Sequence, residues 1–96
     1  MKSQISDVQE CYICRRFLGV ETTENLQSHH FIHGRGLREL ADEDGLFAPL
    51  CVTHHKALHD NPSHPYDKEL KAIAQETYLQ THTREEFLKR YGKFFD

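Results

Sequence analysis

Tryptophan is absent from the sequence, and only 38% of its 96 residues are hydrophobic. No apolar run is long enough for a signal peptide or a membrane-spanning helix. The length predicts a single domain over residues 1–96, and a domain of this size buries only roughly 60–65% of its unfolded surface. Because such a core is small, we expect a bound metal or a disulfide to add to its stability.

Cysteine is scarce, and its three residues are an odd number. An odd count argues against a closed set of disulfides. In a reducing compartment, clusters of cysteine and histidine are more often metal sites than disulfides. We therefore expect a cytoplasmic protein whose cysteines bind a metal.

The sequence also has no excess of positive charge. It contains 12 lysines and arginines and 15 aspartates and glutamates, which gives a net charge of −3. A strongly basic chain would attract a phosphate backbone by its charge alone. Binding of nucleic acid by this chain would have to depend on bound cations and on small groups of basic residues. These groups are Arg15 with Arg16, Arg35 with Arg38, and Lys89 with Arg90 and Lys93.

The first half of the chain is expected to contain loops and short strands. Residues 1–10 are polar and predict a loose N-terminus. The segment RRFLGV, residues 15–20, is expected to be a short strand that follows a knuckle turn. The other expected elements are a strand over residues 26–34, a glycine-bounded loop over residues 35–45 with one helical turn in LREL, and a strand over residues 46–51.

The second half is expected to be helical. The segment VTHHKALHDN, residues 52–61, is typical of a helix that PSHP ends. Apolar residues from Leu70 to Leu79 lie on one face of a further helix. Thr83 and Glu86 fit a capping box that opens a last helix. Together, the two halves predict an α+β fold.

Four residues have the spacing of a structural zinc site. Cys11 and Cys14 form C-x2-C, and Cys51 and His54 form C-x2-H much later in the chain. Two residues between ligands let both side chains converge on one tetrahedral ion, and this site would use all three cysteines. The alternative is a redox-active C-x-x-C beside an unrelated buried Cys51, although no thioredoxin-like βαβ pattern surrounds the pair.

A second cluster, of histidines, overlaps the first in sequence. His55 and His59 are four residues apart, so they share a helix face and can bind one ion together. A third ligand would come from His29 or His30, which lie on an expected strand. Because successive strand residues point to opposite faces, we expect one to bind the metal and the other to have a different role. Three protein ligands leave open positions on the ion, as catalytic sites do, whereas the simpler alternative is a solvated helix face.

The order of these motifs, C-x2-C, S-H-H and L-C-x2-H-H-x3-H, resembles the HNH, or ββα-metal, nuclease family in its zinc-stapled form. The resemblance covers residues 11–61, about half of the chain. Residues 66–96, the expected C-terminal helices, are similar to small HNH-type proteins of phages and prophages. The resemblance implies a ββα-metal core with a Cys3His zinc knuckle, DNA as the partner and a bacterial host cell.

The resemblance also implies a role for each histidine. Carried over by position, His29, His55 and His59 hold a catalytic metal, and His30 is the general base that activates water. Candidate ions are Mg²⁺, Mn²⁺, Ni²⁺ and Zn²⁺, and imidazole ligands favour a transition metal. Two arginines are expected to hold adjacent phosphates, namely Arg35 and Arg38.

One residue of the family pattern is missing. The middle Asn, which orients the general base, normally lies a few residues before the Leu-Cys pair, but this segment reads DEDGLFAPLC. Asp44 or a backbone carbonyl could replace it. Alternatively, the chain is a weak or inactive zinc-binding module that binds nucleic acid, or a protein partner in phage recombination or counter-defence. A third interpretation is a zinc-stapled interaction domain without a second metal.

The remaining histidines and the last basic group are expected to have no part in the site. We interpret His33 as a loop residue, and His64 and His82 as ordinary surface histidines. The group formed by Lys89, Arg90 and Lys93 is interpreted as a solvated helix face.

Overall fold

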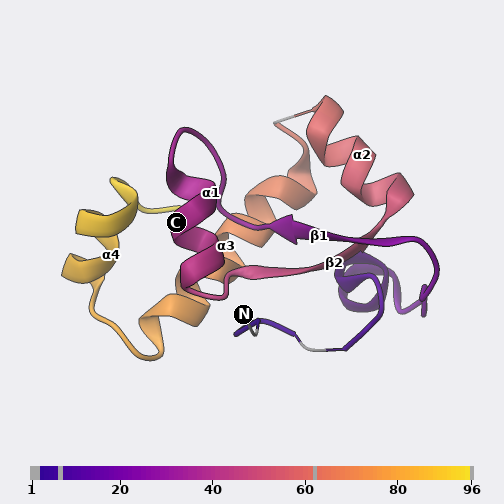
Figure 1. The fold of residues 1–96 in the computed structure, drawn as a ribbon, viewed down its shortest axis with the longest axis horizontal. Helices are drawn as coiled ribbons and strands as arrows, with labels where there is room; N and C mark the ends of the chain where they lie inside the picture. Colours follow the sequence, from indigo (N-terminus) through magenta and orange to yellow (C-terminus); the bar gives the residue numbers. More distant parts are fainter. Residues whose placement is uncertain (1–2, 7, 62, 96) are drawn as a thin grey trace.

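The computed structural model describes residues 3–6, 8–61 and 63–95. It is an α+β fold with one two-stranded sheet, as the sequence predicts. Figure 1 shows the strands in the middle of the molecule, with α2 beyond one end of them and α4 at the other side of α1. The elements in chain order are a π-helical turn Cys14–Leu18, β1 Leu26–His30, α1 Leu37–Glu43, β2 Phe47–Cys51, α2 Val52–Asp60, α3 Pro65–Leu79 and α4 Arg84–Tyr91.

The two strands pair antiparallel, and their register fixes where the paired histidines lie. His29 lies opposite Ala48 and His30 opposite Phe47. Side chains alternate along a strand, so the two histidines point to opposite faces. His29 is buried and points towards α2, where its ring meets that of His55 edge to face, with the ring centres 5.3 Å apart. His30 points away from α2, towards α1. The expected division of this pair between two faces is confirmed.

The core lies where the strands and the loop after β1 meet α3 and α4. Phe31, Leu46 and Leu50 are fully or almost fully buried beside the sheet. The predicted apolar face of α3 is confirmed, because Leu70 and Ala74 are fully buried there. These side chains hold the C-terminal helices against the hairpin that carries the histidines.

The ends of the C-terminal helices follow the predicted signals. Thr83 and Glu86 form a reciprocal capping box at the start of α4. Gly92 ends that helix with φ 86°, a conformation that costs glycine little. His64 has a use that was not predicted from the sequence, since its Nδ1 accepts a hydrogen bond from the Tyr66 backbone N–H at 3.1 Å and caps α3.

Four segments of the first half differ from the sequence-based expectation. The strand expected over residues 26–34 ends at His30. Residues 15–20 are no strand, because the chain winds into the π-helical turn, and the Val20 N–H donates to the Cys14 carbonyl at 3.0 Å. The segment 35–45 holds a helix, α1, of seven residues rather than one helical turn. The N-terminus is not loose over its described part, since the Gln4 N–H donates to the Gly45 carbonyl at 2.8 Å and Ile5 packs against the core.

One buried ion-pair network joins the loop after β1 to α3. Asp67 is only 2% exposed, and its carboxylate accepts hydrogen bonds from His33 Nε2 and Lys71 Nζ, each at 2.8 Å. Burial raises the pKa of Asp67, but these two hydrogen bonds outweigh burial and lower it below its ordinary value. His33 lies in a loop, as expected, and its contact with Asp67 anchors its ring to α3.

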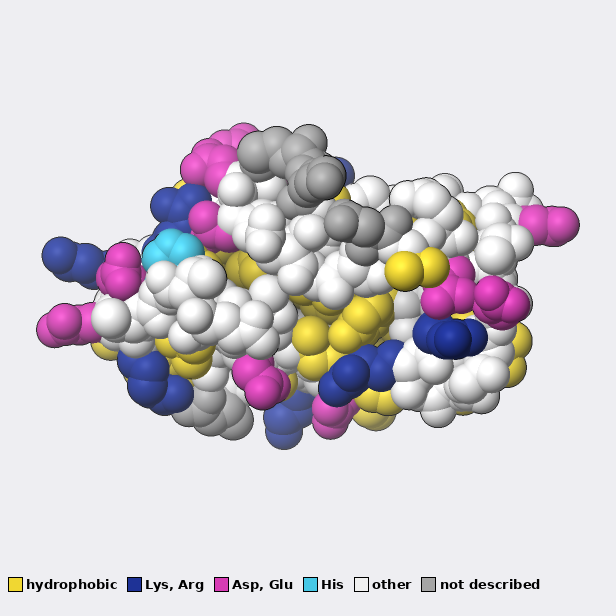
Figure 2. All heavy atoms as spheres, turned by 90° about the horizontal axis from the view of Figure 1, so that it is seen from below, with side chains coloured by type: hydrophobic (Ala, Val, Ile, Leu, Met, Phe, Trp, Pro, Cys, Tyr) yellow, Lys and Arg dark blue, Asp and Glu magenta, His cyan; other side chains and the backbone are white. Residues whose placement is uncertain are grey.

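The outer surface carries charges of both signs. On the face in Figure 2, dark blue and magenta side chains are interspersed around a yellow apolar patch. No helix in the described part of the chain is long and apolar enough to cross a membrane.

We predict that Asp67→Ala lowers the free energy of unfolding by about 1.5–3 kcal/mol, because it removes the buried carboxylate that accepts hydrogen bonds from the partly exposed His33 and Lys71. The matched control is Asp60→Ala, which removes the exposed i,i+4 pair of Asp60 with Lys56 and should change stability by no more than about 0.5 kcal/mol. Urea unfolding of the zinc-loaded proteins at pH 7 measures both values. Equal losses in the two variants would contradict a structural role for the buried network.

Candidate metal centre

The four residues of the predicted zinc site come together from two distant segments. Cys11 and Cys14 lie at the start of the π-helical turn, where the Cys14 N–H donates to Cys11 Sγ at 3.5 Å. Cys51 ends β2 and is also the N-cap residue of α2, so His54 lies on the first turn of that helix. All three cysteines are buried and none forms a disulfide.

The distances within this cluster match the edges of a tetrahedron around zinc. His54 Nδ1 lies 3.7, 3.4 and 3.3 Å from the Sγ atoms of Cys11, Cys14 and Cys51. The Sγ atoms of Cys14 and Cys51 are 3.9 Å apart. Zinc bonds of ~2.3 Å to sulfur and ~2.0–2.1 Å to nitrogen give tetrahedral edges of about 3.8 Å between sulfurs and about 3.6 Å between sulfur and nitrogen. The four side chains could therefore hold a metal such as zinc.

The protonation states of the cluster suit a cation. Burial lowers the pKa of His54, and the nearby His64 lowers it further, so the ring is neutral at pH 7. Burial raises the pKa of the Cys14 thiol to about 11. A bound cation would reverse that effect, because it stabilises the thiolate that binds it.

The predicted second cluster also converges. His29, His55 and His59 each offer a ring nitrogen within 4.8 Å of the others. Nε2 of His55 and Nε2 of His59 are 3.1 Å apart. Among the described residues, His29 Nε2 is the one buried side-chain nitrogen or oxygen atom without a hydrogen-bond partner. Such an atom is costly unless something pairs with it.

Burial also fixes the charge of His29. Burial, followed by the neighbouring imidazoles of His55 and His33, lowers the pKa of His29 to about 3. Its ring is neutral at pH 7, which is the form in which imidazole binds a metal.

Gln27 orients one of these imidazoles. Gln27 lies two residues before His29, on the same face of β1, and its Oε1 is in hydrogen-bond contact with His55 Nδ1. An amide oxygen only accepts, so His55 Nδ1 carries the proton and Nε2 keeps its lone pair. That lone pair is on the side of the ring that faces His59.

The histidines line a cavity of about 490 Å³. Arg38, at the start of α1, lines this cavity, whereas Arg35 is exposed in the loop before α1 and outside the lining. Of the two predicted phosphate-binding arginines, the structure therefore brings only Arg38 to the histidines. The lining of the cavity also includes two histidines outside this cluster, His30 and His33.

The carboxylate beside His30 is Asp42 and not Asp44. His30 Nε2 donates to Asp42 Oδ1 at 2.9 Å, and this hydrogen bond lowers the pKa of Asp42. Asp44 instead accepts a hydrogen bond from Arg90 Nε at 2.6 Å, which ties α1 to α4. Two residues along a helix turn the side chain by about 200°, so the two carboxylates point to different sides of α1.

Only some of the site residues that were missed could have been found from the sequence. Gln27 could have been found, because strand alternation puts it on the face of His29. Asp42 could not, since its contact with His30 depends on α1, and that segment was expected to be a loop. His33 and Asp67 are 34 residues apart, and their pairing depends on how α3 packs.

We predict that Cys14→Ser abolishes zinc binding and unfolds the domain, because zinc contributes about 10–16 kcal/mol in zinc-finger peptides. The control is His54→Cys, which keeps four ligands and should stay folded with one zinc per chain. Far-UV circular dichroism and metal analysis measure both outcomes. A zinc-free Cys14→Ser protein of normal thermal stability would contradict the structural role of this cluster.

Comparison of the chain with protein families, with curated proteins and with solved structures finds no match. By their own geometry, the side chains of Cys11, Cys14, Cys51 and His54 could hold a metal such as zinc. The buried cysteines, the tetrahedral spacing and the three sulfur donors are typical of a structural zinc site.

Proposed function

We propose that this chain is a metal-dependent endonuclease of the HNH, or ββα-metal, type that hydrolyses DNA phosphodiester bonds. The observation that carries the proposal is the convergence of three imidazoles in a cavity beside a fourth, His30, which is paired with a carboxylate. Phosphodiester hydrolysis needs a cation at the phosphate and a base for the attacking water. The cavity offers residues for both.

His29, His55 and His59 would hold the second metal. Bonds of ~2.0–2.1 Å to nitrogen require ligand nitrogens about 2.9–3.4 Å apart for angles between square and tetrahedral, and the two α2 imidazoles are 3.1 Å apart. The unpaired Nε2 of His29 fits the third position. Mg²⁺, Mn²⁺, Ni²⁺ and Zn²⁺ are candidates, and three neutral imidazoles favour a transition ion. An ion bound there would polarise the phosphate and stabilise the leaving 3′ oxygen.

His30 acts as the general base in this proposal. Its Nε2–H donates to Asp42, so the neutral ring carries its lone pair on Nδ1, which can accept a proton from water. Asp42 fixes the orientation of the ring and stabilises the imidazolium that forms, and thereby takes the place of the missing Asn. Arg38 lines the same cavity and can bind the phosphate with charge-assisted hydrogen bonds.

The proposed zinc site supports this chemistry indirectly, because it holds the helix that carries His55 and His59. Cys51 and His54 tie the first turn of α2 to the N-terminal turn, and His55 and His59 follow on the same helix. The position of α2 against β1 decides whether His55 and His59 reach His29. Zinc is therefore structural, and the imidazole cluster is the proposed catalytic site.

We predict that Gln27→Ala weakens divalent-metal binding at the imidazole cluster about 10–100-fold, the usual effect of removing a partner that orients a metal-binding histidine. Titration calorimetry of the zinc-loaded protein with Ni²⁺ and Mn²⁺ measures the affinity. The matched control is Gln80→Ala, at an exposed position beyond α3, which should leave it unchanged. If the zinc-loaded wild type bound neither Ni²⁺ nor Mn²⁺, the second site would be contradicted.

We predict that the protein nicks supercoiled plasmid DNA with a divalent ion and that His30→Ala lowers the rate about 10²–10⁴-fold. Asp42→Asn should cause a smaller loss, because the ring of His30 stays in place. Glu39→Gln is the control, since it removes the same charge from an exposed position of α1. Plasmid nicking is followed on agarose gels after the fold and zinc content of each variant have been matched to the wild type.

The outcome also separates this proposal from the alternative of a binding module without cleavage. Nicking that His30→Ala abolishes would support the endonuclease. No nicking by either protein with any of the four ions, together with retained DNA binding, would overturn it in favour of the binding module.

A further inference from the structure

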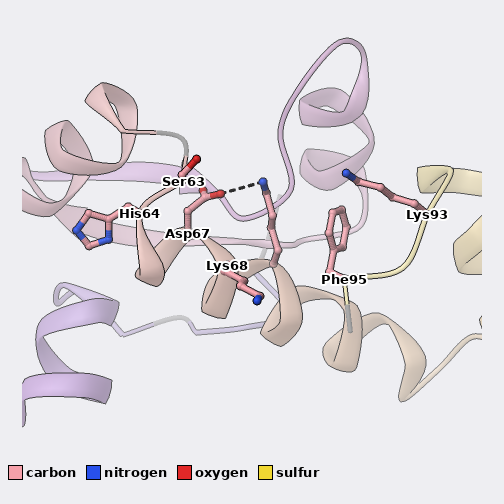
Figure 3. Close-up of a pocket in the computed structure, with 7 residues that line it drawn as sticks. Ser63, His64, Asp67, Lys68, Lys93 and Phe95 are labelled. Carbon is pink, nitrogen blue, oxygen red and sulfur yellow. Dashed lines mark ion pairs between the residues drawn. The ribbon is translucent and has the colours of Figure 1, made fainter.

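A second pocket, which we call the lysine pocket, lies between α3 and the segment that follows α4. It has a volume of about 320 Å³, which is at the lower end of the range for ligand sites. Figure 3 shows Lys93 and Phe95 on the C-terminal side of the pocket, opposite the residues of α3. The lysine pocket is lined by Asp67, Lys68, Lys71, Lys93 and Phe95, with Ser63 and His64 at the start of α3.

Positive charge exceeds negative charge in the lysine pocket, although the whole chain is acidic. Three lysines and one carboxylate line it. That carboxylate, Asp67, already accepts hydrogen bonds from His33 and Lys71 at 2.8 Å each. Within the described part of the chain, Lys68 and Lys93 form no ion pair, and both are exposed. An anion that enters the pocket therefore meets two ammonium groups without an acidic partner.

An aromatic ring stands beside these ammonium groups. The Nζ atoms of Lys71 and Lys93 lie 5.9 and 5.6 Å from the ring centre of Phe95. The Phe95 backbone N–H donates to Oε1 of Gln75 at 2.6 Å, and Gln75 is a buried side chain of α3. The ring is thus tied to α3 rather than left on a free end. Aromatic rings beside cations bind nucleotides, since the base stacks and the phosphate pairs with the cation.

The lysine pocket adjoins the imidazole cavity. His33 lines the imidazole cavity, and its hydrogen-bond partner Asp67 lines the lysine pocket. In Figure 3, a dashed line marks the ion pair of Asp67 with Lys71, and Asp67 lies next to Ser63. The hydrogen-bonded pair of His33 and the buried Asp67 therefore lies between the proposed catalytic cavity and a cationic, aromatic pocket.

We propose that the lysine pocket binds one nucleotide of the substrate strand outside the bond that is cut, with its phosphate at Lys68 and Lys93 and its base against Phe95. The inference rests on the proposed function for its substrate, a nucleic-acid strand. A free mononucleotide presents the same phosphate and base, so the experiment has to compare the two.

Binding of fluorescein-labelled single-stranded and duplex DNA to the zinc-loaded protein tests the pocket by fluorescence anisotropy. All variants carry His30→Ala, so that binding is measured without cleavage. Lys68→Glu and Lys93→Glu should each weaken binding at least about fivefold at 0.15 M salt. Each should also make the slope of log K against log salt shallower by about 0.9 for duplex and about 0.7 for single-stranded DNA, the values for one lost phosphate contact. The matched control is Lys89→Glu, an exposed lysine of α4 outside the pocket.

The role of the ring is tested with Phe95→Leu, which keeps an apolar side chain but removes stacking. It should weaken binding without changing the salt slope. Equal weakening by Lys89→Glu and the two pocket variants would overturn the pocket, as would no effect of Lys93→Glu. If the wild type does not cleave DNA but the pocket variants still lose affinity selectively, the result would support the lysine pocket and overturn the proposed endonuclease activity. Tighter binding of free dAMP than of the strand would overturn the assignment to a strand.

Discussion

The convergence of three thiolates and one imidazole on a single tetrahedral position is the constraint on which the rest of the molecule depends. Cys51 is the last residue of β2 and the N-cap of α2, so a cation at this position fixes the angle at which the helix leaves the sheet. A domain of this size has a net stability of only about 5–15 kcal/mol, and zinc in finger peptides contributes about 10–16 kcal/mol. A metal held by these four side chains would therefore decide whether α2 stays against the hairpin.

The same geometry gives neighbouring histidines different properties. His29 and His30 are adjacent in sequence, but strand alternation turns one towards α2 and the other towards α1. His29 is buried without a hydrogen-bond partner, and burial lowers its pKa to about 3. His30 is half-buried and donates to the exposed carboxylate of Asp42. One ring is thus suited to bind a cation, and the other to exchange a proton.

The sequence was sufficient for those parts of the site that depend on spacing within one element. The C-x2-C, C-x2-H and H-x3-H patterns each place their ligands on one turn or one helix face, and both predicted clusters come together in space. The sequence was insufficient for contacts that depend on an element without a clear hydrophobic periodicity. Segment 35–45 has glycines at both ends and only two helical turns, so α1 was missed, and with it the contact of Asp42 with His30.

Long-range packing explains the other differences. The pairing of His33 with Asp67 requires α3 to lie beside the loop after β1, and the lysine pocket requires α3 to lie beside the segment after α4. A local pattern cannot predict either arrangement. The π-helical turn Cys14–Leu18 was also missed, because RRFLGV was interpreted as a short strand. Arg38 reaches the histidines and Arg35 does not, because α1 begins between them.

The central claim is that one zinc closes the cluster of Cys11, Cys14, Cys51 and His54. X-ray absorption at the zinc edge, on protein loaded with one equivalent of zinc, tests it most directly. We expect three sulfur ligands at about 2.3 Å and one nitrogen ligand at about 2.0–2.1 Å. A shell of nitrogen and oxygen ligands without sulfur would contradict the account, because the metal would then not hold α2 to the N-terminal turn.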